Sequence, residues 1–179
     1  MRQRLVRVER LLHNGADVIY PFWSPDGARL AYNPRTESCS IIEVGKPWGE
    51  QTPRRVPAPP AARPDGFSAF SWSPDSRKLG GWISSPTENA GILIYTFETN
   101  SFERLTDFGS KPSWLHDNGR LLFGYGGKLF LVNSETKKVQ KISLHSPHYL
   151  FEYGVTSDDR TLYYTLATTE ADIWLLNLE

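Results

Sequence analysis

Four segments of the sequence share one pattern, in which an aspartate sits in a turn and a leucine follows four residues later. The segments begin at Trp23, Trp72, Trp114 and Val155 and read WSPDGARLAY, WSPDSRKLGG, WLHDNGRLLF and VTSDDRTLYY. Their aspartates are Asp26, Asp75, Asp117 and Asp158. A pattern that returns about every 40 to 50 residues marks a repeat architecture, in which each unit covers its apolar face by stacking on the next. The repeat therefore limits the fold more than any other feature of the chain.

The shared residues are those of a tight turn. Proline fixes φ near −65°, aspartate accepts hydrogen bonds from the backbone beyond it, and the next residue must tolerate a positive φ. That next position holds Gly27, Ser76, Asn118 and Asp159. Glycine, asparagine and aspartate suit a left-handed conformation well, and serine suits it less. We therefore assign the four motif aspartates a structural turn role and expect no catalytic role for them.

The segments between the turns are typical of β-strands. The chain is rich in aromatic residues, with six Trp, eight Tyr and nine Phe, and these favour strands. Glycine, proline, asparagine and aspartate interrupt it too often for long helices. The third strand of each unit is apolar on both faces, at 39–44, 91–97, 128–133 and 172–178. Because no helices are available to cover such sheets, they must cover one another around an axis. We predict an all-β fold, a β-propeller with four blades per chain.

The motif resembles the repeat of the TolB-like propellers, relatives of the tryptophan-aspartate repeat, which runs Pro-x-Trp-Ser-Pro-Asp-Gly before an apolar strand. The segment 21–32, PFWSPDGARLAY, matches almost fully, 70–82 matches closely, and the third unit matches in part. The fourth unit keeps only the aspartate and the strand. The ending EADIWLLNLE is similar to the close of propellers fused to bacterial Ser/Thr kinases. The resemblance implies the fold, whereas blades of this family serve many functions.

We expect one domain, 1–179, because the chain is too short for two large ones. The predicted blades cover about 18–57, 67–107, 110–144 and 150–179. Outer strands are expected near 54–58, 102–108 and 138–144, whereas the fourth unit stops after its third strand.

Residues 4–12, RLVRVERLL, precede the first blade and resemble an outer strand. We predict that they pair with the last strand and complete the fourth blade, because an unpaired edge there would invite aggregation. A helix over the same residues is the alternative, since VERLL contains good helix formers.

The closing strand completes the blade either of its own chain or of a partner chain. We expect two chains to form an eight-bladed homodimeric ring through exchange of these N-terminal strands, in preference to a closed four-bladed monomer. A piece of a larger propeller, as in a longer bacterial signalling protein, is a third alternative.

Charge and composition exclude several classes of partner. Twenty basic and twenty acidic residues cancel, which argues against nucleic acid and against an anionic membrane. No apolar run is long enough to span a membrane, and the first residues lack the features of a signal peptide. We expect a cytoplasmic chain. The single cysteine, Cys39, lies in an apolar strand and is expected to be packed and inert.

The sequence shows no catalytic motif. His145 and His148 have a spacing that suits a metal but lack a nearby third ligand, and His13 and His116 lie in expected loops. The GYGG segment, 124–127, is predicted to be a hairpin between strands rather than a phosphate loop. We therefore expect no enzyme activity, no metal and no cofactor.

A binding surface is the remaining expectation. The loops between second and third strands gather at one end of a propeller, and Arg35, Glu37, Glu88, Asn89 and Glu170 lie in three of them. These residues form the predicted binding rim, with ordinary solvated turns as the alternative. Trp48 lies in a proline-rich excursion, 45–66, and is either exposed for a partner or folded onto its own blade.

We accordingly predict a non-catalytic scaffold or sensor module that binds an unidentified protein or small ligand. The alternative is a propeller-type enzyme, such as a sugar-directed lyase, with its site in the channel. Some propellers similar to TolB are polysaccharide lyases with a histidine-rich metal site, a cluster that this sequence does not show.

Overall fold

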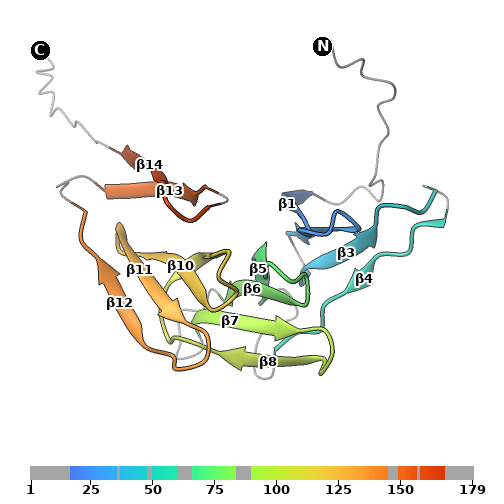
Figure 1. Ribbon diagram of the computed structural model, residues 1–179. Coiled ribbons are helices and arrows are strands. Elements are labelled where there is room, and N and C mark those ends of the chain that lie inside the picture. The colour runs from blue at the N-terminus through green and yellow to red at the C-terminus, as the bar shows by residue number, and fades with distance from the viewer. Residues whose placement is uncertain are drawn as a thin grey trace, which may run out of the picture.

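The chain folds into antiparallel β-sheets. The computed structural model describes residues 17–35, 37–47, 50–59, 66–83, 90–144, 149–156 and 158–167. Over these ranges it contains fourteen strands and no α-helix. The strands form four sheets that follow one another around a common centre, as the blades of a propeller do (Figure 1). The predicted all-β propeller with four blades is therefore confirmed.

Each of the first three blades is a sheet of four strands in chain order. Within a blade, every strand pairs antiparallel with the strand that follows it. Blade 1 contains β1 Val18–Trp23, β2 Arg29–Pro34, β3 Ser40–Glu43 and β4 Arg54–Arg55. Blade 2 contains β5 Ser68–Trp72, β6 Lys78–Ile83, β7 Gly91–Thr96 and β8 Ser101–Arg104. Blade 3 contains β9 Ser110–Trp114, β10 Arg120–Tyr125, β11 Lys128–Asn133 and β12 Val139–Ile142. In blade 4 the described strands are β13 Tyr149–Val155 and β14 Leu162–Ala167. The outer strands β4, β8 and β12 lie where the sequence predicts them.

The predicted closing strand, residues 4–12, and the predicted last strand, 172–178, lie outside the described residues. Their pairing, in one chain or between two, stays a prediction. No helix in the described part of the chain is long and apolar enough to cross a membrane.

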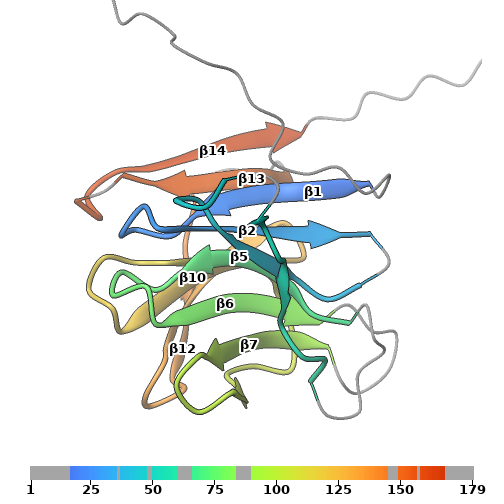
Figure 2. The same cartoon turned by 90° about the vertical axis from the view of Figure 1, so that its right-hand side faces the viewer.

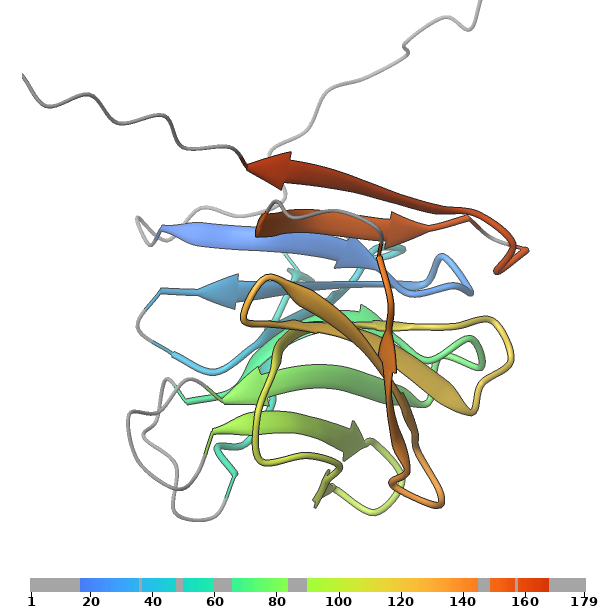
Figure 3. The same ribbon diagram turned by 90° about the vertical axis from the view of Figure 1, so that its left-hand side faces the viewer.

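The blades curve around an open side. The first strand of each blade lies toward the inside of the curve and the outer strands β4, β8 and β12 lie at its periphery (Figure 1). Blade 1 and blade 4 are the two ends of the row and stand apart across the open side. The turns β1–β2, β5–β6, β9–β10 and β13–β14 all point to one side, which we call the turn face (Figures 2 and 3). The opposite side, with the β2–β3 and β10–β11 connections, is the loop face.

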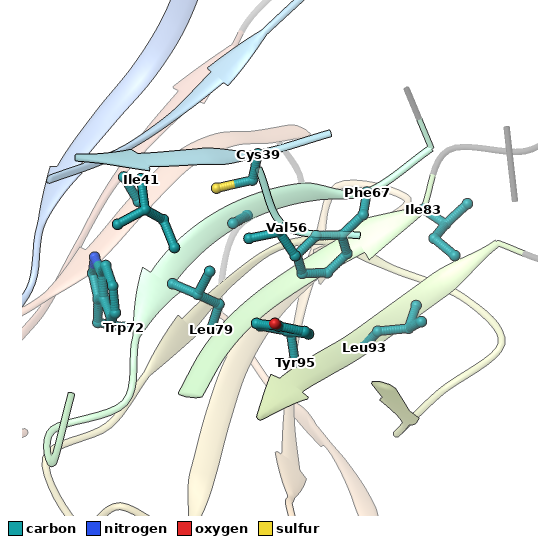
Figure 4. Close-up of a cluster of buried hydrophobic side chains, with 11 residues drawn as sticks. Cys39, Ile41, Val56, Phe67, Trp72, Leu79, Ile83, Leu93 and Tyr95 are labelled. Atoms are coloured by element: carbon teal, nitrogen blue, oxygen red, sulfur yellow. The ribbon is translucent and has the colours of Figure 1, made fainter. Parts of the chain in front are cut away.

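Apolar side chains fill the spaces between adjacent blades. Between blades 1 and 2, Ile41 and Cys39 pack with Leu79, Trp72 and Tyr95, all of them buried (Figure 4). Corresponding clusters join blade 2 to blade 3 and blade 3 to blade 4. Each inner sheet is thus covered on both faces by its neighbours, which is the solution that its strands, apolar on both faces, require.

Buried hydrogen bonds also join the blades. The strand register shifts once in each of β1, β5, β9 and β13, which marks a β-bulge in every inner strand. Next to the bulge of β5, the backbone N–H of Ala69 donates to Oδ1 of Asn33 at 2.9 Å, and Nδ2 of Asn33 donates to the Ala69 carbonyl at 2.8 Å. Between blades 2 and 3 the hydroxyl of Ser71 donates to the Pro112 carbonyl at 2.8 Å. Polar side chains thereby satisfy backbone groups of the next blade.

The motif tryptophans pack into the preceding blade. Trp72 is 5% exposed, and its indole N–H donates to the Phe22 carbonyl of blade 1 at 3.3 Å. Trp114 is 6% exposed and packs beside Gly80 of blade 2. Trp23 occupies the same position in blade 1, where no described sheet precedes it, and is 55% exposed.

Candidate functional site

The motif aspartates hold the turns together on the turn face. Oδ1 of Asp75 accepts the Ser73 hydroxyl at 2.6 Å and the Arg77 backbone N–H at 3.0 Å. Asp26, Asp117 and Asp158 likewise accept backbone N–H groups two residues further along the chain. The residue after each aspartate has a positive φ, with values of 71° at Gly27, 59° at Ser76, 58° at Asn118 and 56° at Asp159.

Each turn also contacts the turn of the neighbouring blade. The Asp26 backbone N–H donates to the Ser76 hydroxyl at 3.2 Å, and the Asn118 amide donates to Asp75 at 3.1 Å. The backbone N–H of His116 donates to Asp159 at 2.7 Å, and its imidazole lies 3.2 Å from the same carboxylate. The turns therefore form a continuous row across the four blades.

The hydrogen bonds of the row lower the pKa of the motif aspartates. For Asp26 the largest cause is the hydrogen bond from the Ser24 hydroxyl, and for Asp158 it is that from Thr156. Burial alone would raise the pKa of Asp75 and Asp117, but the hydrogen bonds that they accept outweigh it and their pKa is lowered too. All four groups are thus stabilised as carboxylates.

The structure describes two residues of the predicted binding rim, Arg35 and Glu37, and each forms an ion pair within blade 1. The guanidinium of Arg35 lies 3.4 Å from the Asp17 carboxylate, and Glu37 forms an ion pair with Arg55 of β4. Arg35 and Glu37 therefore have different partners. The other predicted rim residues, Glu88, Asn89, Glu170 and Trp48, lie outside the described residues, so the grouping of acidic side chains at one rim stays a prediction.

The structure places a cleft on the loop face, between blades 3 and 4, that we call the tyrosine cleft. It has a volume of about 180 Å³. Three tyrosines line it, Tyr125, Tyr149 and Tyr153, together with Lys111 and Lys128. The first two tyrosines are 56% and 58% exposed. Aromatic rings together with a few polar groups in a concave site are features that ligand-binding sites share.

A glycine turn shapes the cleft. Gly126 and Gly127 connect β10 to β11 with φ values of 56° and 70°, which confirms the hairpin predicted for the GYGG segment. A side chain at Gly127 would come within 2.5 Å of the Tyr149 ring, so the ring lies directly against the turn. On the blade 3 side, Tyr125 contacts Phe108 edge to face, with ring centroids 5.0 Å apart. The two exposed tyrosines thus stand on either side of a bare backbone turn.

The floor and the charges of the cleft come from both blades. The hydroxyl of Tyr153 in β13 donates to the Ser110 carbonyl at 3.2 Å and to the carbonyl of Lys111. Burial raises the pKa of Tyr153, so it remains a neutral donor. The ammonium group of Lys111 forms an ion pair with Glu152. Within the described ranges, Lys128 has no ion-pair partner.

Tyr149, Lys111 and Lys128 were not predicted from the sequence as site residues. The one sequence signal near the cleft was the GYGG hairpin, which contains Tyr125 and lies on the face where loops were expected to gather. The described part of the chain contains no group of three or more His, Cys, Asp or Glu side chains arranged to hold a metal ion. His145 and His148 lie outside it. Burial raises the pKa of the Cys39 thiol to about 12.

No protein-family model matches the sequence, and no curated protein matches it. Several solved structures share the fold. TolB from Acinetobacter baumannii is 15% identical with a TM-score of 0.63, and the match covers 86% of this chain and 39% of that one. The putative TolB from Agrobacterium tumefaciens is 15% identical with a TM-score of 0.57, covering 86% of this chain and 71% of that one. An oligogalacturonate lyase in complex with manganese is 16% identical with a TM-score of 0.67, and the match covers 89% of this chain and 50% of that one.

These likenesses show a β-propeller fold, which this chain shares with the TolB structures and the lyase. The chain spans about two fifths of the Acinetobacter TolB and half of the lyase. Four blades thus correspond to a part of these propellers.

Proposed function

We propose that this chain is a non-catalytic β-propeller binding module and that the tyrosine cleft holds its ligand. The observation that carries the proposal is the pair of exposed rings, Tyr125 and Tyr149, on either side of the glycine turn. Tyrosine offers a large apolar ring and a polar hydroxyl at a low cost in side-chain entropy, which is why it is common in binding surfaces.

The size and the charge of the cleft indicate the ligand. Its volume of about 180 Å³ is smaller than the roughly 300 to 1,000 Å³ typical of small-molecule sites. It therefore accommodates one ring or one side chain of a larger ligand. Lys128 and Lys111 both line it, and the charge of Lys111 is balanced by Glu152. A lysine that lines the cleft and has no ion-pair partner among the described residues favours an acidic ligand, such as an acidic sugar.

Saturation-transfer NMR with digalacturonate, and with maltose as the neutral comparison, tests the proposal. We expect transfer to digalacturonate in the unmodified protein and its loss in Tyr149→Ala. Lys128→Gln is expected to weaken binding of the acidic sugar and to make the remaining binding insensitive to salt.

Tyr164→Ala is the matched control, because Tyr164 is also an exposed tyrosine of blade 4 but does not line the cleft. Equal loss of transfer in the two tyrosine variants, or no transfer to digalacturonate in any form of the protein, contradicts the proposal.

A sugar-directed lyase is the second candidate function. Its support is the structural likeness to the oligogalacturonate lyase in complex with manganese, at 16% identity. Incubation with Mn²⁺ and oligogalacturonate distinguishes the two functions, because a lyase releases products with a new double bond that absorb ultraviolet light. The binding module leaves the oligosaccharide intact. A role within a larger bacterial signalling protein stays a prediction.

A further inference from the structure

The two ends of the blade row expose the positions that the inner blades bury. Trp72 and Trp114 are 5% and 6% exposed because each packs against the preceding blade. Trp23 has the same place in the repeat and the same strand environment, but it is 55% exposed. Its exposure follows from its position at the start of the row.

Blade 4, at the opposite end, exposes the position that faces the next blade in the other units. This position is the residue five places after each motif aspartate. In the first three blades it is Ala31, Gly80 and Leu122, and all three are buried. In blade 4 it is Tyr163, which is 62% exposed and whose ring lies across Gly154 of β13.

These two positions meet at the interfaces between blades. A Cβ placed on Gly80 would lie 3.0 Å from the indole nitrogen of Trp114, so the motif tryptophan packs against this residue of the preceding blade. Trp72 and Ala31 belong to one buried cluster in the same way. Trp23 of blade 1 and Tyr163 of blade 4 therefore occupy the two positions that contact each other at an interface between blades, but they lie on the first and the last blade of the described row.

We propose that a second copy of this chain covers both ends. Blade 1 of each copy packs against blade 4 of the other, so that Trp23 of one chain lies on Tyr163 of its partner. A twofold axis makes both contacts at once, between the described faces of blades 1 and 4.

A second copy fits these ends because one chain carries both complementary faces. The new contact joins two large rings. The first two inner interfaces join tryptophan to alanine or glycine, and the third joins Val155 to Leu122. Offset stacking of aromatic rings accommodates this difference, and tryptophan and tyrosine are the residues that most often dominate protein interfaces. The inference is independent of the ligand proposed for the tyrosine cleft.

Light scattering after size-exclusion chromatography tests the assembly directly. We expect the mass of two chains at micromolar concentrations. Trp23→Glu and Tyr163→Glu are each expected to raise the dissociation constant about 30-fold or more, since each removes a central aromatic contact and places a charge in the interface. Because both side chains are exposed in the single chain, both variants should keep the β-sheet circular dichroism spectrum of the unmodified protein.

Tyr125→Glu is the control, because Tyr125 is 56% exposed but lies on the loop face. It should remain a dimer. Mixing a Trp23→Cys chain with a Tyr163→Cys chain should allow a short bismaleimide to join the two chains, whereas neither variant alone should cross-link. A single-chain mass for the unmodified protein up to the highest soluble concentration overturns the proposal. So does a dimer that both glutamate variants leave intact.

Discussion

Asn33 provides the sharpest test of how the blades hold one another. It lies in β2 of blade 1 and is 2% exposed. Its amide exchanges two hydrogen bonds with the backbone of Ala69 in blade 2, at 2.8 and 2.9 Å, and Ala69 is 0% exposed. Asn33→Ala therefore leaves one backbone N–H and one carbonyl buried without their partner.

The cost follows from this burial. Each buried backbone group left without a hydrogen bond costs about 1 to 3 kcal/mol. The variant is therefore expected to lose about 2 to 6 kcal/mol of unfolding free energy, a large part of the roughly 5 to 15 kcal/mol that stabilises a typical domain. For a chain of this size the melting temperature should fall by about 4 to 24 °C.

Urea unfolding followed by tryptophan fluorescence measures this loss. Asn133→Ala is the matched control, because the Asn133 side chain also accepts two backbone hydrogen bonds, from Glu135 and Thr136, but in an exposed turn. Water replaces those bonds, so the control should lose less than about 1 kcal/mol. A loss at Asn33 no larger than that at Asn133 would refute the idea that buried polar contacts join blades 1 and 2.

Four further outcomes are expected. Trp72→Ala should cost about 3 to 5 kcal/mol of unfolding free energy in urea titrations, because it empties a buried site between blades. Gly91→Ala should cost about 3 kcal/mol or more by the same assay, since φ is 123° and the new Cβ would lie 2.2 Å from the Thr106 carbonyl oxygen. Cys39 should resist thiol reagents in the folded protein and react on unfolding, as burial raises its pKa to about 12. Asp75 has a lowered pKa. Its stabilising contribution is therefore present above the unfolded pKa of about 3.9 and lost as pH falls through the lower folded value, so Asp75→Asn should flatten the acid loss of stability measured by urea titration from pH 5 to pH 2.

The parts of the fold that depend on local sequence were predictable. The left-handed residue after each motif aspartate follows from turn chemistry, and Ser76 adopts it with a φ of 59° although serine suits it less well. The strands on either side follow from their apolar patterns. The curved arrangement then follows because sheets apolar on both faces, without helices, can only cover one another.

The contacts between blades were not predictable from one sequence. In the sequence, nothing distinguishes Asn33 from any other polar residue in a strand, because its hydrogen-bond partner Ala69 belongs to another blade. Trp23, Trp72 and Trp114 have nearly the same local sequence, yet their exposure depends on whether a blade precedes them. The tyrosine cleft was not predicted for the same reason, since Tyr149 contacts the Gly127 turn only after blade 4 packs on blade 3.

The central claim is that adjacent sheets pack face to face in chain order. Nuclear Overhauser spectroscopy on the folded protein tests this claim most directly. The structure predicts cross-peaks between the Leu121 methyl groups and Gly80, between the Tyr153 ring and Gly124, and between the Asn33 side-chain amide and Ala69. Each pair joins two successive blades. Cross-peaks confined to single sheets, with all three of these pairs absent, would contradict the propeller arrangement.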